Sequence, residues 1–220
     1  MRSIRTVIFA NGELQDLDAA RAVVQPTDTI IAADGGAKHC LALGVLPHIL
    51  IGDFDSLAPT DLTALEAAGT RIIRHPARKD QTDLELALDF ALTGGADDII
   101  VLGALGGRWD QTLANLLLLA WPALSSTRIR LLDGTQEISL LRGPGELTFA
   151  GTAGDTISLI PVGGDASGIT TSGLEYPLSG ETLNFGSTRG ISNVMIEPQV
   201  TVALTKGLLI CVTIRVNGFT

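Results

Sequence analysis

Residues 71–102 read RIIRHPARKDQTDLELALDFALTGGADDIIVL and contain one complete strand–helix–strand unit. The β-branched run at its start predicts a strand, and Thr82 and Glu85 have the spacing of a helix capping box. Apolar residues then recur on one face of the predicted helix, which Gly94 and Gly95 should end. A second β-branched run closes the unit. Such a unit favours two parallel strands joined by a helix that covers the sheet.

The same alternation of strand-like and helix-like segments extends over residues 1–134. It predicts an α/β domain with a mostly parallel sheet. A second helix is predicted from one apolar face, and Pro122 should end it because proline removes a backbone donor. That face consists of Leu113, Leu116, Leu117 and Ala120. The strands are expected at Thr6–Ala10, Thr29–Ala33, Ile49–Ile51, Arg71–Arg74, Ile99–Leu102 and Arg128–Leu132.

After residue 134 the pattern changes to short strand-like runs separated by Gly, Pro, Asn and Ser. Helical periodicity is no longer found. Regularly spaced short strands indicate an all-β sandwich or barrel, which would occupy residues 135–220. Its strands are expected at Ile138–Leu141, Thr156–Ile160, Val194–Ile196, Val200–Leu204 and Leu208–Val216.

The chain of 220 residues carries 15 basic and 24 acidic side chains, a net charge of −9. Nucleic-acid phosphates need clustered Lys and Arg, so this balance argues against a nucleic-acid partner. Cys40 and Cys211 lack metal or redox spacing and are expected to be buried, reduced packing residues. No signal-peptide pattern is found at residues 1–9, and the longest apolar run, Leu116–Leu124, is too short for a membrane span. We expect a cytoplasmic protein without a membrane partner.

Aspartates follow four of the predicted parallel strands. Ligands of open α/β sheets bind outside the carboxyl ends of the strands, so these positions are where chemistry is expected. A single Asp after a strand is often only a turn or helix-cap residue. Several carboxylates at one sheet edge repel each other, however, and a divalent cation such as Mg²⁺ would neutralise them. The aspartates are Asp34, then Asp53 and Asp55, then Asp80 and Asp83, and finally Asp110.

Glycines flank these aspartates at residues 34–36, 52–56 and 103–110. Glycine-rich loops let backbone N–H groups approach a phosphate, although tight turns need glycine as well. Neither a Walker A sequence nor Gly-x-Gly-x-x-Gly is present. Lys79 and Arg108 are candidate partners of a polyphosphate, or else solvated surface charges. The three histidines share no metal-ligand spacing and are expected to be structural or surface residues.

These motifs resemble those of the thiamine pyrophosphokinase family. The resemblance rests on ADGGA at 33–37, GDFDS at 52–56, KDQTD at 79–83 and GGRWDQ at 106–111. In the β-rich half, GLEYPL at 173–178 and STRGISN at 187–193 are similar to the thiamine-binding segments of the family. The resemblance therefore spans nearly the whole chain.

The resemblance implies a homodimer of chains with an α/β catalytic domain and a β-sandwich domain. Thiamine would bind near the subunit interface. The family transfers the pyrophosphoryl group of ATP to the hydroxyethyl oxygen of thiamine, with Mg²⁺, and releases thiamine diphosphate and AMP.

Site residues follow from the matched motifs. The residues expected to hold Mg²⁺ or to orient the nucleophile are Asp53, Asp55, Asp83 and Asp110. The residues expected to contact ATP are Asp34, Gly35, Lys79, Gln81, Thr82 and Arg108. The residues expected to contact thiamine are Tyr176, Ser192 and Asn193.

The sequence defines the roles of some of these residues and leaves others open. Asp55 or Asp83 would accept the hydroxyl proton, and the sequence does not separate these two. Asp80 is expected to be structural. Tyr176 stands where some relatives carry Trp, so it keeps an aromatic ring with a smaller stacking area.

Two other functions are compatible with parts of this pattern. A related pyrophosphokinase that acts on a pterin alcohol would keep the aspartate edge but need a different ring pocket at residues 173–193. A nucleotide-sensing module without turnover would tolerate the loss of metal-site carboxylates, whereas every expected aspartate is present.

Overall fold

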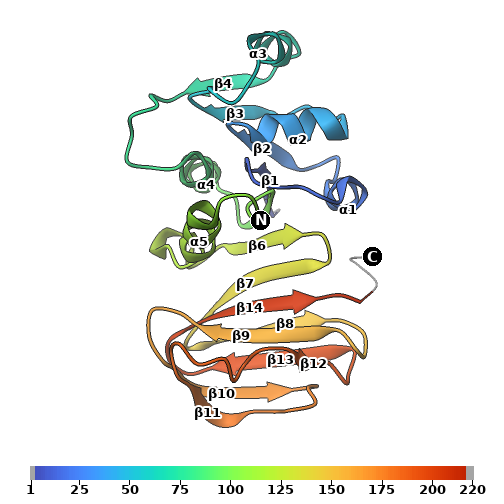
Figure 1. Ribbon diagram of the computed structural model, residues 1–220, viewed down its shortest axis with the longest axis vertical. Helices are drawn as coiled ribbons and strands as arrows, with labels where there is room; N and C mark the ends of the chain where they lie inside the picture. Colours follow the sequence, from blue (N-terminus) through green and yellow to red (C-terminus); the bar gives the residue numbers. More distant parts are fainter. Residues whose placement is uncertain (1–2, 217–220) are drawn as a thin grey trace. The chain divides into compact units, whose positions relative to one another are not determined.

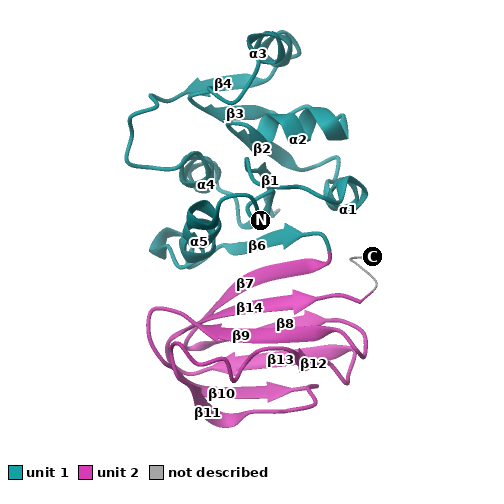
Figure 2. Cartoon of the chain, viewed as in Figure 1, with its two compact units in different colours: residues 1–134 teal, residues 135–220 magenta. Residues whose placement is uncertain are grey.

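The computed structural model describes residues 3–216. The chain divides into two compact units, unit 1 at Met1–Gly134 and unit 2 at Thr135–Thr220 (Figure 2). Among the described residues, no helix is long and apolar enough to cross a membrane.

Unit 1 contains six strands in the order β6-β5-β1-β2-β3-β4. All neighbouring pairs in this order are parallel, which confirms the predicted parallel sheet. The chain runs outward from β1 to β4 and then returns to the other side of β1 to form β5. The crevice beside β1 is therefore the topological switch point of the sheet. The strands are β1 (Arg5–Phe9), β2 (Thr29–Ala33), β3 (Ile49–Gly52), β4 (Arg71–Arg74), β5 (Asp98–Leu102) and β6 (Arg128–Asp133).

Helices connect these strands. Helix α2 packs against β1 and β2, and α4 packs against β1, β2 and β3 (Figure 1). The predicted N-cap of α4 is confirmed, because the Glu85 N–H donates to Thr82 Oγ1 at 3.2 Å, and Gly94 is the C-cap. The Glu85 side chain accepts from Gln81 Nε2, so the reciprocal half of the predicted capping box is not seen among the described residues. Its predicted apolar face is buried against the sheet. The helices are α1 (Leu17–Val23), α2 (Gly36–Leu43), α3 (Pro59–Ala67), α4 (Asp83–Thr93), α5 (Trp109–Leu118) and the 3₁₀ helix η1 (Pro122–Leu124).

The predictions for α5 are partly wrong. The helix ends at Leu118, and Pro122 starts η1 instead of ending α5. The predicted apolar face is not all turned inward, since Leu113 and Leu117 are 57% and 56% exposed. The inward position is taken by the buried Asn115, whose Nδ2 donates to the Ala104 carbonyl oxygen at 2.7 Å. This face of α5 thus supports the loop after β5.

Unit 2 is a sandwich of two antiparallel sheets, with the orders β12-β9-β14-β7 and β11-β10-β13-β8. Leu159 and Leu209 from the first sheet share one buried core with Val200 and Val202 from the second. The sandwich alternative of the sequence prediction is therefore confirmed. The strands are β7 (Gln136–Arg142), β8 (Gly145–Ala150), β9 (Thr156–Pro161), β10 (Ala166–Ser172), β11 (Ser179–Leu183), β12 (Asn193–Val194), β13 (Gln199–Leu204) and β14 (Leu208–Ile214).

Three strands of unit 2 were not predicted, namely β8, β10 and β11. Their sequences, GELTFA, ASGITTS and SGETL, mix Thr, Ile, Leu and Phe with Gly, Ala, Ser and Glu, so none of them shows a long β-branched or apolar run. Antiparallel partners supply their backbone hydrogen bonds, so tertiary context overrides weak strand propensity. The two cysteines are free and buried, as expected.

Candidate active site

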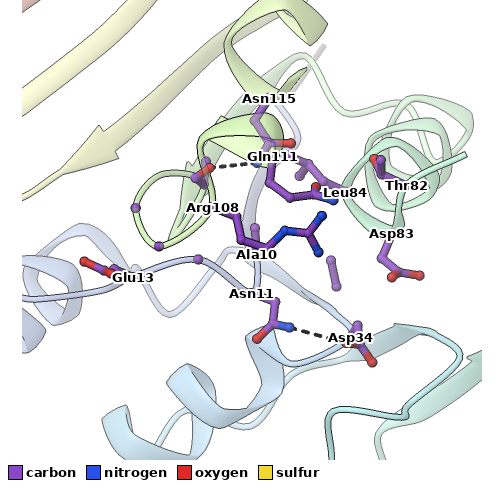
Figure 3. Close-up of a pocket in the computed structure, with 15 residues that line it drawn as sticks. Ala10, Asn11, Glu13, Asp34, Thr82, Asp83, Leu84, Arg108, Gln111 and Asn115 are labelled. Atoms are coloured by element: carbon purple, nitrogen blue, oxygen red, sulfur yellow. Dashed lines mark hydrogen bonds between the residues drawn. The ribbon is translucent and has the colours of Figure 1, made fainter. Parts of the chain in front are cut away.

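A cavity of about 380 Å³ opens at the carboxyl ends of β1, β2 and β5, at the switch point of the sheet (Figure 3). The loop after β1, the end of β2, the start of α4 and the segment from β5 into α5 all contribute. Its lining residues are Ala10, Asn11, Gly12, Glu13, Ala33, Asp34, Thr82, Asp83, Leu84, Ala104, Gly106, Gly107, Arg108, Gln111 and Asn115.

Glycine allows α2 to begin directly against the end of β1. A Cβ on Gly36 would lie 1.9 Å from the Phe9 carbonyl oxygen, and one on Gly35 would lie 2.0 Å from Asn11 Oδ1. Neither distance is compatible with a side chain. These glycines therefore bring the N-terminus of α2 next to the end of β1 and to Asn11, which lines the cavity.

Three carboxylates meet beside the cavity. One oxygen each of Asp34, Asp53 and Asp55, here called the carboxylate triad, lie within 4.8 Å of one another. Asp34 is buried, Asp53 is half-buried and Asp55 is exposed. Three oxygen donors at this spacing fit a hard divalent cation, which suits the expected Mg²⁺. The triad includes Asp34, which the sequence motifs placed among the ATP contacts.

The backbone that carries the triad is unusual at two positions. Asp34 and Phe54 have φ angles of 45° and 67°, in the left-handed region. The Phe54 N–H donates to Asp34 Oδ1 at 3.1 Å. The Arg74 guanidinium lies 4.8 Å from the centre of the Phe54 ring, and its Nη1 donates to the Asp53 carbonyl oxygen at 3.1 Å. These contacts stabilise the strained loop that orients Asp53 and Asp55.

Asp83 lines the cavity at the first turn of α4, next to Thr82 (Figure 3). Lys79 Nζ lies 2.5 Å from Asp83 Oδ1. Burial raises the pKa of Asp83, and the charges of Asp34 and Asp53 add to this, while the hydrogen bond and charge of Lys79 oppose it. Asp83 thus faces the carboxylate triad but is paired with a lysine.

Arg108 extends into the cavity from the loop before α5 (Figure 3). Its Nε and Nη2 donate to the two oxygens of Asp110 at 3.1 and 2.5 Å, a bidentate pair in which both side chains are exposed. The hydrogen bond from Arg108 lowers the pKa of Asp110. Asp110 thus restrains the guanidinium and lies outside the carboxylate triad.

The remaining predicted ATP contacts lie at helix starts. Gly35 is the N-cap of α2 and Thr82 is the N-cap of α4. Gln81 is exposed and its Nε2 donates to Glu85 Oε1 at 3.3 Å. Asp80 is exposed, and it is not among the residues that line the cavity.

The sequence interpretation overlooked the loop after β1. Asn11 Nδ2 donates to Ser56 Oγ at 3.3 Å and lies 3.5 Å from Asp34 Oδ2. Glu13 lines the cavity, and His39 Nε2 lies 2.9 Å from the Gly12 carbonyl oxygen. The predicted strand at residues 6–10 marked this loop as a strand end, so the rule that located the aspartates would also have located these residues.

The three predicted thiamine contacts lie together in unit 2. Tyr176 is 68% exposed. Its N–H donates to Asn193 Oδ1 at 3.1 Å, and Asn193 Nδ2 donates to the Tyr176 carbonyl oxygen at 2.7 Å. Ser192 has a φ of 58°, and its N–H donates to Ser158 Oγ at 3.0 Å. The side-chain amide of Asn193 therefore contacts the backbone of Tyr176.

Two family profiles match the chain. The thiamin pyrophosphokinase catalytic domain matches residues 20–131, and the thiamin pyrophosphokinase vitamin B1 binding domain matches residues 144–209. The chain belongs to the thiamine pyrophosphokinase family. Within this family, the thiamine pyrophosphokinase of Bacillus subtilis is 37% identical over 183 residues, which are 83% of this chain and 85% of that protein.

Solved structures of the thiamine pyrophosphokinase family share the fold. The Bacillus subtilis enzyme matches with a TM-score of 0.86 and 32% identity, over 96% of this chain and 99% of that chain. The thiamin pyrophosphokinase of Geobacillus thermodenitrificans matches with a TM-score of 0.84 and 29% identity, over 96% and 97% of the two chains. At 17% identity, yeast thiamin pyrophosphokinase still matches with a TM-score of 0.83, over 100% and 89% of the two chains.

Proposed function

We propose that this member of the family transfers the pyrophosphoryl group of ATP to the hydroxyethyl oxygen of thiamine, forming thiamine diphosphate and AMP. The observation that carries this proposal is the cavity at the switch point of unit 1, where Asp34, Asp83 and Arg108 converge. Such a site combines a cationic group for polyphosphate with carboxylates for a metal ion. The relative that is 37% identical is a thiamine pyrophosphokinase, which supports the same acceptor here.

The carboxylate triad is our candidate for the Mg²⁺ site. Its donors are oxygens only and lie within 4.8 Å of one another, as suits an ion that takes a few carboxylates and completes its shell with water and phosphate oxygens. Bound there, Mg²⁺ would supply positive charge against the polyphosphate. Asp83 and Asp110, which the motifs also suggested as ligands, each already face a cationic side chain, so we give them other roles.

Asp83 is our candidate for the group that accepts the hydroxyl proton. The sequence left Asp55 and Asp83 open for this role. Asp83 lines the cavity, and burial raises its pKa towards the range in which a carboxylate is an effective base. Asp55 is exposed and belongs to the carboxylate triad, where a bound cation would hold it ionised. Lys79 fixes the Asp83 side chain through their 2.5 Å contact.

The polyphosphate would lie against Arg108, with Asp110 holding the guanidinium fork in place. Gly35 and Thr82 begin α2 and α4, whose first backbone N–H groups favour phosphate oxygens. We include Lys79 and Gln81 among the proposed ATP contacts because they lie just before Thr82 and Asp83, which line the cavity at the start of α4. In-line placement of the nucleophile against the β-phosphorus would supply most of the remaining acceleration.

Thiamine would bind to unit 2 through Tyr176 and Ser192. The exposed Tyr176 ring offers a stacking surface for an aromatic cation, and the Ser192 hydroxyl offers a hydrogen bond for the aminopyrimidine. The match of residues 144–209 to the vitamin B1 binding domain supports this assignment.

We further propose that the protein is a cytoplasmic homodimer, with thiamine near the subunit interface. Exposed apolar side chains support association, because Trp109, Leu113 and Leu117 follow one another along α5 at 80%, 57% and 56% exposure. Two free, buried thiols suit a reducing compartment.

Incubation with ATP, Mg²⁺ and thiamine, followed by assay of AMP and thiamine diphosphate, tests the proposed reaction. We expect both products in equal amounts, no product when Mg²⁺ is chelated, and loss of turnover in Asp55→Ala with an unchanged circular dichroism spectrum. Faster turnover with hydroxymethylpterin than with thiamine would support the pterin kinase instead. Tight ATP binding without AMP release would support the nucleotide sensor.

A further inference from the structure

The loop that presents Tyr176 is attached to the segment around β12. Leu174 and Met195 form an antiparallel bridge. The Glu175 N–H donates to the Val194 carbonyl oxygen, and the Ile196 N–H donates to the Gly173 carbonyl oxygen, both at 2.9 Å. These backbone bonds hold the loop as far as Glu175. The next residue, Tyr176, carries its ring into solvent, so a separate contact must fix it.

That contact comes from one side chain, Asn193. Its Oδ1 accepts the Tyr176 N–H at 3.1 Å, and its Nδ2 donates to the Tyr176 carbonyl oxygen at 2.7 Å. Both backbone polar groups of Tyr176 are therefore bonded to a single amide. The pair restrains the φ and ψ angles on both sides of the Tyr176 Cα, and so it sets the direction in which the ring leaves the backbone.

We propose that Asn193 is a positioning residue for thiamine, acting through Tyr176 and not by contact with the substrate. This inference rests on the proposed function, since it takes the Tyr176 ring as the surface on which the thiamine ring stacks. Without Asn193 the ring would sample several directions, and substrate would have to order it on binding. Loss of Asn193 should therefore lower the affinity for thiamine, whereas the residues of the proposed ATP site in unit 1 are unchanged.

Asn193→Ala removes both hydrogen bonds, and we expect the KM for thiamine to rise about tenfold or more, with kcat and the KM for ATP within about twofold of wild type. Asn193→Asp keeps an acceptor for the Tyr176 N–H but sets a carboxylate against the Tyr176 carbonyl oxygen, so it should raise this KM as well. A residue in direct contact with cationic thiamine would instead bind more tightly as Asp. Asn184→Ala, at an exposed Asn of the same unit, is the matched control.

A double-mutant cycle separates the two roles further. Tyr176→Ala removes the ring through which Asn193 is proposed to act. In that background, Asn193→Ala should change the thiamine KM by less than about twofold, because the effects of coupled residues are not additive. Multiplicative effects of the two substitutions would show direct contact and overturn the proposal.

The chain contains one tyrosine, so ¹⁵N-tyrosine labelling gives a single amide resonance, that of Tyr176. We expect its hydrogen exchange to be slow in wild type and in Asn184→Ala, and faster by about tenfold or more in Asn193→Ala. Fast exchange in wild type would show that the two hydrogen bonds from Asn193 do not restrain Tyr176. Faster exchange in Asn193→Ala with an unchanged thiamine KM would overturn its role in recognition. A wild-type protein that forms no thiamine diphosphate would overturn the proposed function. The exchange rates would still show whether Asn193 restrains the backbone of Tyr176.

Discussion

Replacing Asp34 by Asn should stabilise the metal-free protein and weaken its response to Mg²⁺. The oxygens of Asp34, Asp53 and Asp55 lie within 4.8 Å of one another. At that separation two unit charges repel by roughly 3.5 kcal/mol at an effective dielectric constant of about 20, and by about 1 kcal/mol in bulk water. Since Asp34 is buried and Asp55 is exposed, we expect the substitution to relieve about 2 kcal/mol in total.

Asn is the appropriate substitution because it preserves the local structure. Asn tolerates the left-handed φ of 45° at position 34, and its Oδ1 can still accept the Phe54 N–H. The relief of about 2 kcal/mol corresponds to a rise in Tm of roughly 4 to 8 °C for a protein of this size in EDTA. Asp34→Ala removes the same charge but also the acceptor, so it should gain less stability or lose some.

Differential scanning calorimetry in EDTA and in Mg²⁺ measures both effects. Mg²⁺ should raise the Tm of wild type by binding the folded state, and Asp34→Asn should lose most of this increase. Asp89→Asn, which removes an exposed charge from α4, controls for net charge and should change neither quantity by much. If Asp34→Asn lowers the Tm in EDTA and keeps the full Mg²⁺ response, the triad does not bind the cation and the reasoning is wrong.

Three further predictions concern other parts of the fold. Thr82→Ala should cost about 1 kcal/mol in urea unfolding because α4 loses its N-cap, and Thr82→Ser should restore it; equal stability of all three forms would contradict the capping role. Burial raises the pKa of Cys40 and of Cys211 to about 12, so dithiobisnitrobenzoate at pH 8 should titrate neither thiol within minutes in the folded protein and both in urea. Burial would raise the pKa of Asp155, but hydrogen bonds from the Val216 and Thr152 N–H groups and from Arg215 outweigh it and hold this pKa below its usual range. The stability that these bonds contribute is complete above the ordinary value near 3.8 and is lost as the pH falls through the lower folded pKa. Asp155→Asn should therefore cost about 3 kcal/mol at neutral pH, with a smaller difference from wild type in acid; a constant difference from neutral pH to pH 2 would contradict this assignment.

The sequence predicted the location of the candidate site better than its detailed geometry. Parallel strands bring their carboxyl ends to one edge whatever the side chains do, so Asp34, Asp53 and Asp83 were expected to be neighbours. Which carboxylates converge depends on the φ angles at Asp34 and Phe54, and strand periodicity contains no information about those angles. The exclusion of Asp110 from the carboxylate triad depends on its bidentate pairing with Arg108, two residues away.

Helical periodicity likewise predicted that α5 exists but not which way it faces. The apolar face with Leu113 and Leu117 is exposed in the chain as described, because Asn115 is used to hold the loop after β5. A buried Asn that bonds a backbone carbonyl has no signature in the spacing of apolar residues. In unit 2, the Gly-, Ser- and Thr-rich strands were not predicted, because their formation depends on pairing with strands that are distant in the sequence.

Trp109, which follows Arg108 at the start of α5, should allow ATP binding at the candidate site to be followed by fluorescence. It is 80% exposed, and both tryptophans belong to unit 1 whereas the one tyrosine belongs to unit 2. Tryptophan emission therefore comes from unit 1 alone. An indole next to Arg108, the proposed polyphosphate contact, should change its emission when ATP binds, and this change should be lost in Trp109→Phe, which keeps Trp121. The protein thus carries its own fluorescent reporter for ATP binding at the candidate site of unit 1.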